Sequence, residues 1–280
     1  MNSLVSKIGL GTVQFGLNYG ISNNKGITEK AEVKNILNYS KSIGIELIDT
    51  AFSYGKSEEV LGQVGVDSFK VVTKFLPSTH ELNIEDQINT SFKRLKVESV
   101  YGLLAHRPQN IAENPEIWDY LNQLKQNKIV LKIGFSFNTP EEVEFILKRG
   151  FVPDLIQVPF NYLDNRFMPY MIYYKNNDCE IHSRSTFLQG LFFSEPDTLG
   201  DFFDEIKPLL RNLRREGKNL SEMLLGYCLQ QSFIDKVIIG VNDKEQLVEN
   251  INSINNCLKL PELTISVKPE ILSPSYWPKK

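Results

Sequence analysis

The chain has 280 residues, of which 41% are hydrophobic and 23% are charged, a balance typical of a folded globular protein. Its formal charge of −3 provides no basic surface for nucleic acid, and no run approaches the roughly 20 apolar residues that span a bilayer. Three distant cysteines and three scattered histidines predict neither a disulfide framework nor a metal centre. We therefore expect a cytoplasmic protein without metal, nucleic-acid partner or membrane segment.

Short apolar segments rich in Ile, Val and Leu recur along the whole chain, each bounded by polar or turn residues. This pattern is typical of buried parallel strands. Eight such strands are predicted, at residues 7–10, 45–48, 69–73, 99–104, 129–135, 155–158, 180–183 and 236–239.

Amphipathic segments between these strands predict helices. They cover residues 28–42, 57–65, 83–95, 115–126, 140–148, a segment near 166–176, two helices between 201 and 230, and 243–254. Pro140 suits a first helical turn, where its missing N–H costs nothing. Asp243 is a candidate N-cap, with Gln246 three residues later as in a capping box. The tail, residues 265–280, is expected to be an extended strap.

Strand–helix units without a break in composition predict the α/β class and a (β/α)8 TIM barrel, with residues 1–280 as a single domain. A doubly wound open sheet is the rival fold. It usually carries Gly-x-Gly-x-x-Gly after its first strand, whereas this chain has the segment Gly-Leu-Gly-Thr-Val-Gln-Phe-Gly, which lacks that spacing. We therefore favour the barrel, in which chemistry takes place where strands end and loops begin.

Polar side chains lie at or just beyond the ends of three consecutive predicted strands: Asp49, Tyr54, Lys74 and His106. Each alone has a structural explanation, as a cap, a surface aromatic, a solvated lysine or a core histidine. Together they have complementary roles, because an ammonium lowers the pKa of a nearby tyrosine toward the range of a useful acid. Lys74 can supply that charge and Asp49 can hold Lys74, while His106 can bind a carbonyl or shuttle a proton.

The chain resembles the aldo-keto reductase family over nearly its whole length. The most specific element runs from Ile48-Asp49-Thr50-Ala51 through Tyr54-Gly55 to Ser57-Glu58, supported by Gly9-Leu10-Gly11-Thr12, Thr73-Lys74 and His106. The resemblance implies an NAD(P)H-dependent oxidoreductase that reduces an aldehyde or ketone, a sugar-derived one among the candidates. It implies that Tyr54 donates the proton, that Lys74 and Asp49 tune it, and that His106 orients the carbonyl.

The same resemblance implies that the second half of the chain holds the cofactor. Ser136 and Gln157 would contact the nicotinamide amide, and Arg184 would stack on the nicotinamide or contact the pyrophosphate. The resemblance makes NADPH the default expectation. The arginine that often clamps the 2′-phosphate is missing here, however, so NADH is the alternative cofactor. The expected cofactor-binding residues are Ser136, Gln157, Arg184, Ser185, Leu188, Gly190, Gly240, Asn242, Lys244, Gln246, Glu249 and Asn250.

Two other hypotheses stay open. One is a regulatory or sensor protein that binds a nicotinamide cofactor on the same barrel, and the other is a non-redox barrel isomerase or lyase that uses Lys74 and Tyr54 as acid and base. For the reductase, a small carbonyl substrate is expected near the aromatic residues of the barrel mouth: Phe15, Tyr19, Phe52, Phe75 and Phe160. The oligomeric state is not predicted by any feature of the sequence.

Overall fold

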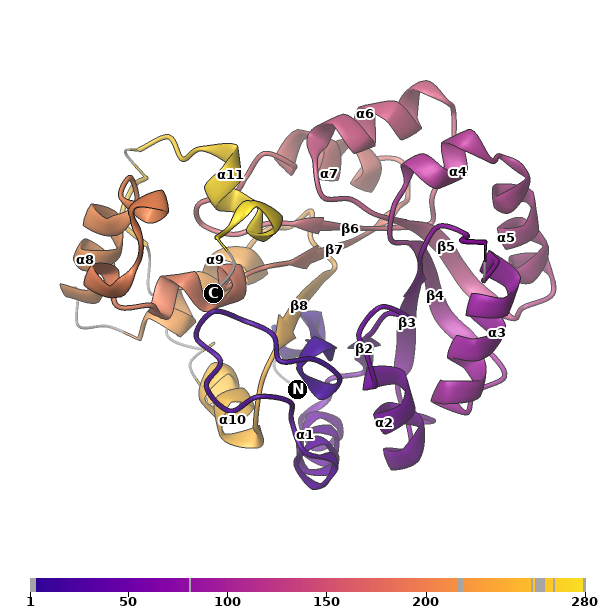
Figure 1. The fold of residues 1–280 in the computed structure, drawn as a ribbon, viewed down its shortest axis with the longest axis horizontal. Coiled ribbons are helices and arrows are strands. Elements are labelled where there is room, and N and C mark those ends of the chain that lie inside the picture. The colour runs from indigo at the N-terminus through magenta and orange to yellow at the C-terminus, as the bar shows by residue number, and fades with distance from the viewer. Residues whose placement is uncertain are drawn as a thin grey trace.

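The computed structural model describes residues 4–80, 82–215, 219–252, 254, 260–263 and 265–278. Parallel strands pair in chain order and close into a barrel, with helices packed around it (Figure 1). The strands are β1 (Ile8–Gly11), β2 (Leu47–Asp49), β3 (Lys70–Phe75), β4 (Val100–Ala105), β5 (Val130–Ser136), β6 (Leu155–Pro159), β7 (Glu180–Arg184) and β8 (Lys236–Gly240). The predicted (β/α)8 fold is confirmed.

The helices follow the predicted order with two additions. They are α1 (Lys30–Ile43), α2 (Ser57–Val64), α3 (Ile84–Leu95), α4 (Gln109–Glu113), α5 (Glu116–Gln126), α6 (Pro140–Lys148), α7 (Met168–Lys175), α8 (Lys207–Arg215), α9 (Leu220–Leu229), α10 (Lys244–Asn252) and α11 (Pro269–Leu272). The additions, α4 and α11, are too short to show a helical period in the sequence.

The tail differs from the extended strap that the sequence predicted. It forms α11 and a 3-10 turn over Pro274–Tyr276. Leu272 and Trp277 are buried in a second apolar cluster that also contains Phe203 and residues of the loop after β7. The tail therefore folds back because its apolar residues are buried there, and residues 279–280 lie outside the described part.

Helix ends follow local side-chain chemistry. Thr139 and Glu142 form a reciprocal capping box around Pro140, the first residue of α6. At α10, Asp243 accepts a hydrogen bond from the backbone N–H of Gln246, which confirms the predicted cap. The Gln246 side chain, however, accepts from the N–H of Asn242, one residue before the position that a capping box requires.

Every strand continues one or two residues beyond its predicted end. The added residues include Asp49 and Ser136, and they remain in register with their neighbours: Gly11 pairs with Asp49, and Ser136 pairs with Gln157. The polar residues expected at or just beyond the strand ends are thus held by the sheet itself. The sheet therefore positions them at the carboxyl end of the barrel.

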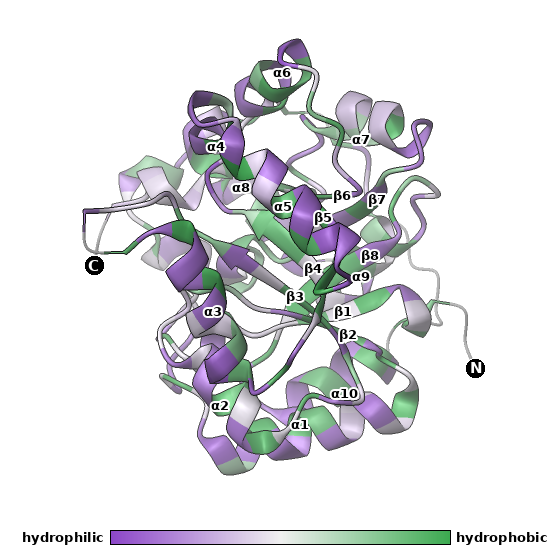
Figure 2. Ribbon diagram, turned by 90° about the vertical axis from the view of Figure 1, so that its right-hand side faces the viewer, coloured by the Kyte–Doolittle hydropathy of each residue, from purple (hydrophilic) through white to green (hydrophobic). Residues whose placement is uncertain are grey.

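Apolar packing fills the barrel and the layer outside it. Leu47, Val72, Leu104, Leu155 and Ile238 form a buried cluster, and a larger cluster includes residues of the strands and the surrounding helices. Figure 2 shows hydrophobic and hydrophilic stretches alternating along the outer helices, as expected for elements with one buried side. No helix in the described ranges is both long and apolar enough to cross a membrane.

Candidate active site

A buried ion pair joins the ends of β2 and β3. The Lys74 Nζ donates to Asp49 Oδ1 at 2.8 Å and to Oδ2 at 2.7 Å, and both residues are almost fully buried. Nζ also donates to the Thr50 carbonyl oxygen at 2.9 Å. A buried ammonium is costly unless hydrogen bonds satisfy it, and these three acceptors fix it in one position.

The Tyr54 hydroxyl oxygen lies 3.5 Å from this ammonium. The positive charge faces the atom that would release a proton, so it stabilises the negative charge that remains on the oxygen. The backbone holds the tyrosine there, since its carbonyl packs against Gly16, where an added Cβ would lie 1.9 Å from the oxygen. The Tyr54 hydroxyl is therefore held beside a fixed cation.

His106 completes the group from the end of β4. Its ring lies edge-on to the Tyr54 ring at a centroid distance of 6.1 Å, and its Nδ1 is 3.2 Å from the Ser53 Oγ. Burial, and then the charges of Lys74, Arg184 and Arg107, lower the pKa of His106 to about 3. The imidazole is thus neutral at neutral pH and carries one ring proton. In the tautomer with that proton on Nε2, Ser53 donates to Nδ1 and the Nε2–H is available to a carbonyl oxygen.

Thirteen buried side-chain polar atoms lack a partner among the described residues, and two of them, Ser136 Oγ and Gln157 Oε1, lie next to this group. The Gln157 Nε2 donates to Asp49 Oδ1 at 2.6 Å, which orients the amide with Oε1 unused. Ser136 and Gln157 are paired in the sheet, so the two unused atoms belong to neighbouring strands. Unpaired buried polar atoms are rare, and a carboxamide offers both the donor and the acceptor that they need.

The segment after β7 contains unusual backbone geometry. Ser185, Leu188 and Gln189 have φ values of 65°, 44° and 50°, three of the six such non-glycine residues in the described chain. Strain of this kind concentrates at functional sites. At Gly190 an added Cβ would lie 1.9 Å from the Ser22 Oγ, so packing against the loop that contains Ser22 already requires a glycine at this position.

The beginning of α10 was expected to receive a phosphate, yet its donors are already used. The Lys244 N–H donates to Glu32 Oε1 at 2.7 Å, and the Gln246 N–H donates to Asp243 Oδ1 at 2.8 Å. Asp243 also pairs with Lys25 at 2.5 Å. The Lys244 ammonium lies over the Tyr39 ring, and not at the beginning of α10 where a phosphate was expected.

The remaining expected residues lie at the same end of β8. Gly240 packs directly against the Gln14 side chain, and Asn242 Oδ1 is buried without a partner among the described residues. Asn250 is buried and Glu249 is exposed on α10. Asn242 therefore offers an unused buried atom to a ligand here, and so does the Oε1 of Gln14.

A family model described as the Aldo/keto reductase family matches residues 7–265. The chain belongs to the aldo/keto reductase family. A Schizosaccharomyces pombe protein provisionally named a voltage-gated potassium channel β subunit is 25% identical over 305 residues, 92% of this chain and 88% of that protein.

Solved structures of similar fold include an aldo-keto reductase from Bacillus halodurans in a holo form, with a TM-score of 0.71, 20% identity and coverage of 91% of this chain and 88% of that one. A Pseudomonas aeruginosa protein provisionally assigned to the aldo-keto reductases gives a TM-score of 0.66 at 22% identity, covering 88% of each chain. Family membership and fold together support an oxidoreductase that acts on carbonyl groups.

The aromatic residues expected around a substrate lie mostly elsewhere in this aldo/keto reductase. Phe15, Phe75 and Phe160 are buried in the core, and Phe52 lies beneath the Arg94 guanidinium. Their rings pack inside the protein or against a neighbouring side chain. The sequence pattern could not distinguish a ring that packs in this way from one that contacts a substrate. Tyr19 remains near the site: its hydroxyl accepts from the Gln189 side chain at 2.8 Å, and burial raises its pKa to about 12.

Some contacts of the site were not predicted from the sequence. Thr50 acts through its carbonyl oxygen, which no side-chain pattern reveals. Ser53 could have been suspected, because it is polar and stands directly before Tyr54 in the same loop. Asn138, which accepts a hydrogen bond from Arg184, follows Ser136 by two residues. The direction of its side chain depends on the backbone turn after β5, which the sequence does not reveal. Among the described residues, no group of His, Cys, Asp or Glu is arranged to hold a metal ion.

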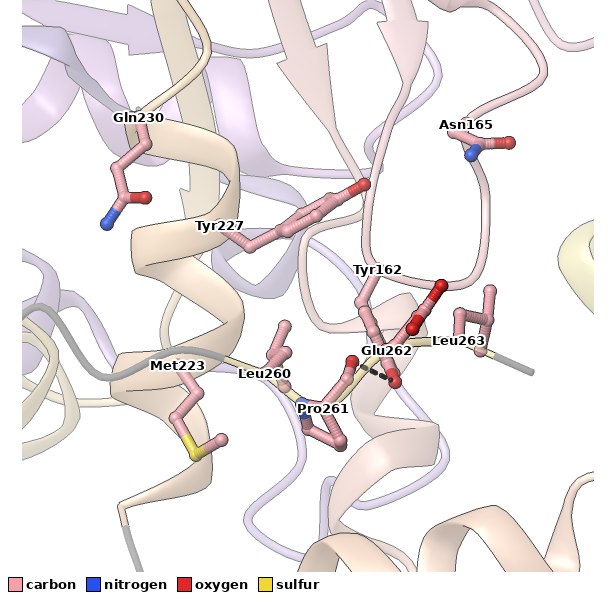
Figure 3. A pocket seen from close by; sticks show the side chains of 9 residues that line it. All are labelled: Tyr162, Asn165, Met223, Tyr227, Gln230, Leu260, Pro261, Glu262 and Leu263. Carbon is pink, nitrogen blue, oxygen red and sulfur yellow. Dashed lines mark hydrogen bonds between the residues drawn. The ribbon is translucent and has the colours of Figure 1, made fainter. Parts of the chain in front are cut away.

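A separate cavity of about 320 Å³ lies away from these residues, between α9 and the segment 260–263 (Figure 3). Its aromatic side is formed by Tyr162 and Tyr227, whose rings meet nearly at right angles, and the Tyr162 hydroxyl donates to the Pro261 carbonyl at 2.9 Å. It is lined by none of the expected catalytic or cofactor-binding residues. It therefore does not enlarge the candidate site.

Proposed function

We propose that the chain is an NAD(P)H-dependent reductase that converts a small aldehyde or ketone to an alcohol, with Tyr54 as the proton donor. The observation that carries the proposal is the position of the Tyr54 hydroxyl, 3.5 Å from an ammonium that Asp49 and a backbone carbonyl hold in place. Neutral His106 beside it provides a hydrogen-bond donor for a carbonyl oxygen.

The unpartnered Ser136 Oγ and Gln157 Oε1 support a nicotinamide cofactor, since they fit its carboxamide. A reduced nicotinamide supplies the hydride that a carbonyl carbon accepts. Arg184, Ser185 and the backbone from Leu188 to Gly190 would hold the middle of the cofactor. Its adenosine end would meet Gly240, Asn242, Lys244, Gln246, Glu249 and Asn250.

The side chains then have defined tasks. His106 Nε2–H donates to the carbonyl oxygen and orients it toward Tyr54. The Tyr54 hydroxyl gives its proton to the alkoxide oxygen, and Lys74 stabilises the tyrosinate that forms. General acid catalysis of this kind typically contributes about 10²–10⁴-fold in rate.

A second candidate is a regulatory protein that binds the cofactor without rapid turnover. The name of the S. pombe relative favours it. A sensor needs the cofactor-binding residues, but it does not need Tyr54, Lys74 and His106 to converge. The assembled group therefore favours turnover, while family membership weighs against the non-redox isomerase or lyase.

The test is carbonyl-dependent oxidation of NADH and NADPH by the purified protein, followed by nicotinamide absorbance over a panel of aldehydes and ketones. Tyr54→Phe should lower kcat about 10²–10⁴-fold while cofactor affinity, measured by fluorescence quenching, stays close to that of the wild type. Tyr276→Phe, at an exposed tyrosine, is the matched control. Cofactor binding without turnover on any carbonyl would support the regulatory candidate, and absence of cofactor binding would refute both.

A further inference from the structure

The first turn of α2 contains a buried serine, Ser57, whose hydroxyl contacts the ends of two strands. Its Oγ lies 2.9 Å from the carbonyl oxygen of Thr12, 2.9 Å from the Thr12 Oγ1 and 3.1 Å from the Thr50 Oγ1. Thr12 follows β1, and Thr50 follows β2. A serine at the start of a helix usually bonds to the N–H groups of that helix, but these contacts go to neighbouring strands. The hydroxyl therefore serves the strand ends.

The number of its partners sets Ser57 apart from other buried serines. Three of these have an Oγ without a partner among the described residues: Ser40, Ser136 and Ser183. The side chains of Thr12, Thr50 and Ser57 are fully buried, and the Thr12 Oγ1 also donates to the Asp49 carbonyl at 2.9 Å. Buried hydroxyls are costly unless they are hydrogen-bonded, so each of these three holds the other two in place.

The Thr50 side of this group adjoins the buried ion pair. The Thr50 N–H donates to the Val72 carbonyl at 2.9 Å, and the Thr50 carbonyl accepts from the Lys74 Nζ at 2.9 Å. Ser57 binds the side chain of the same threonine, and its own N–H donates to the Tyr54 carbonyl at 3.0 Å. One serine thus contacts both segments whose relative position sets the distance from the ammonium to the tyrosine hydroxyl.

The surrounding packing leaves the start of α2 little room to shift. An added Cβ at Gly16 would lie 2.4 Å from the Ser57 nitrogen, and one at Gly62 would lie 2.0 Å from the Arg94 carbonyl oxygen. If the Ser57 Oγ were removed, the helix could not move inward to fill the gap, and the Thr50 hydroxyl would lose its partner. The strain would then fall on Thr50.

We infer that Ser57 is a positioning residue for the proposed proton transfer: it holds Thr50, whose carbonyl fixes the Lys74 ammonium beside the Tyr54 hydroxyl. The inference rests on the proposed reductase function. The printed contacts of the Ser57 hydroxyl are to threonines alone, so its effect passes through Thr50. A displacement of about 1 Å can slow a reaction about 100-fold, and here it would affect the proton donor rather than the binding of carbonyl or cofactor.

Ser57→Ala should lower kcat about 10- to 100-fold, while KM and the cofactor Kd stay near those of the wild type. The rate is expressed per cofactor-binding site, from the stoichiometry of a fluorescence titration, so that unfolded protein is not counted. The solvent deuterium isotope effect on kcat should rise, because proton transfer from Tyr54 becomes slower. Ser40→Ala, which removes a buried serine oxygen without a partner among the described residues, is the matched control and should keep both wild-type values.

Thr50→Val tests the route, and it serves as the second variant if Ser57→Ala does not fold. It removes the hydroxyl and nearly keeps the volume of the side chain, so kcat should fall by a similar factor. Thr50→Ser should recover most of that loss. In the double variant of Ser57→Ala and Thr50→Val the two losses should not multiply, because both changes remove the same bond. Losses that multiply would overturn the inference, as would a Ser57→Ala variant with wild-type kcat or with changes in KM alone.

If the wild type reduces no carbonyl, the proposed function fails, and NMR of protein labelled with ¹³C at the tyrosine Cζ still tests the positioning. The Tyr54 signal, assigned with Tyr54→Phe, should shift at neutral pH in Ser57→Ala and in Thr50→Val but not in Ser40→Ala. An unchanged Tyr54 signal in the first two variants would refute the role of Ser57, whether or not the protein is a reductase.

Discussion

The protonation of His106 determines how the site responds to pH. Burial and three neighbouring positive charges lower its pKa to about 3, so the ring is neutral above that pH. We therefore expect the plot of kcat/KM against pH to show no change of slope near pH 6.5, where an unperturbed histidine titrates. An NMR titration should show the His106 ring signals constant from about pH 5 to 8, with exposed His80 as the internal reference. Titration of His106 near pH 6.5 would contradict this.

The proximity of the candidate catalytic residues was predictable because consecutive strands of a barrel are neighbours. Asp49, Lys74 and His106 follow successive apolar segments, so their order along the chain becomes proximity in space. The bond from Gln157 to Asp49 was not predictable. It connects β6 with β2, strands that are not adjacent, and depends on the barrel's width and on side-chain rotamers.

Strand boundaries show where an apolar pattern stops being informative. The predicted strands ended with the apolar pattern, whereas the observed ladders continue through residues such as Lys74, Ser136 and Arg184. A polar residue is tolerated there because the barrel mouth supplies partners or access to a ligand. Sequence periodicity thus identified the strands, while their last residues, which carry the site, depend on tertiary contacts.

The capped beginning of α10 predicts a preference for NADH. Glu32 and Asp243 place two carboxylates at this end, and a 2′-phosphate would add charge of the same sign. Glu32→Gln combined with Asp243→Asn keeps the hydrogen-bonding groups and removes both charges. We expect the ratio of NADPH to NADH dissociation constants to fall about tenfold, the effect of roughly 1.4 kcal/mol, measured by fluorescence titration.

The matched control for this pair is Glu245→Gln, which removes an exposed charge from the same helix. A wild type that binds NADPH more tightly than NADH, with a ratio unchanged in the double variant, would show that these carboxylates do not face the cofactor.

The opposite end of the barrel is closed by a polar network around Glu180. Its carboxylate accepts from Tyr101 at 2.6 Å and from Lys132 at 2.5 Å, and its other oxygen lies 2.7 Å from His182 Nε2. Burial alone would raise the pKa of Glu180, but the hydrogen bonds from His182, Lys132 and Tyr101 outweigh it and hold the pKa well below the usual range. Strands β4, β5 and β7 are thereby joined near their beginnings.

Glu180→Gln should therefore lower the free energy of unfolding by about 3 kcal/mol at neutral pH. A carboxylate with a lowered pKa stabilises the fold above its unfolded pKa of about 4.3, and the benefit is lost as the pH falls further. The difference between wild type and variant should shrink below about pH 4, as measured by urea unfolding at several pH values. Glu113→Gln, at an exposed glutamate of α4, is the control, and a pH-independent difference would refute the electrostatic origin.

Chemistry and cofactor recognition are assigned to different halves of this barrel. The proton-handling residues lie between positions 49 and 106, and the candidate cofactor-binding residues lie between 136 and 250. Among their described side chains, the hydrogen bond from Gln157 to Asp49 links the two sets. Mutations could therefore accumulate in one half with little effect on the other. A descendant could lose turnover through changes confined to the first half and still report the cell's redox state by binding nicotinamide, an evolutionary route from enzyme to sensor.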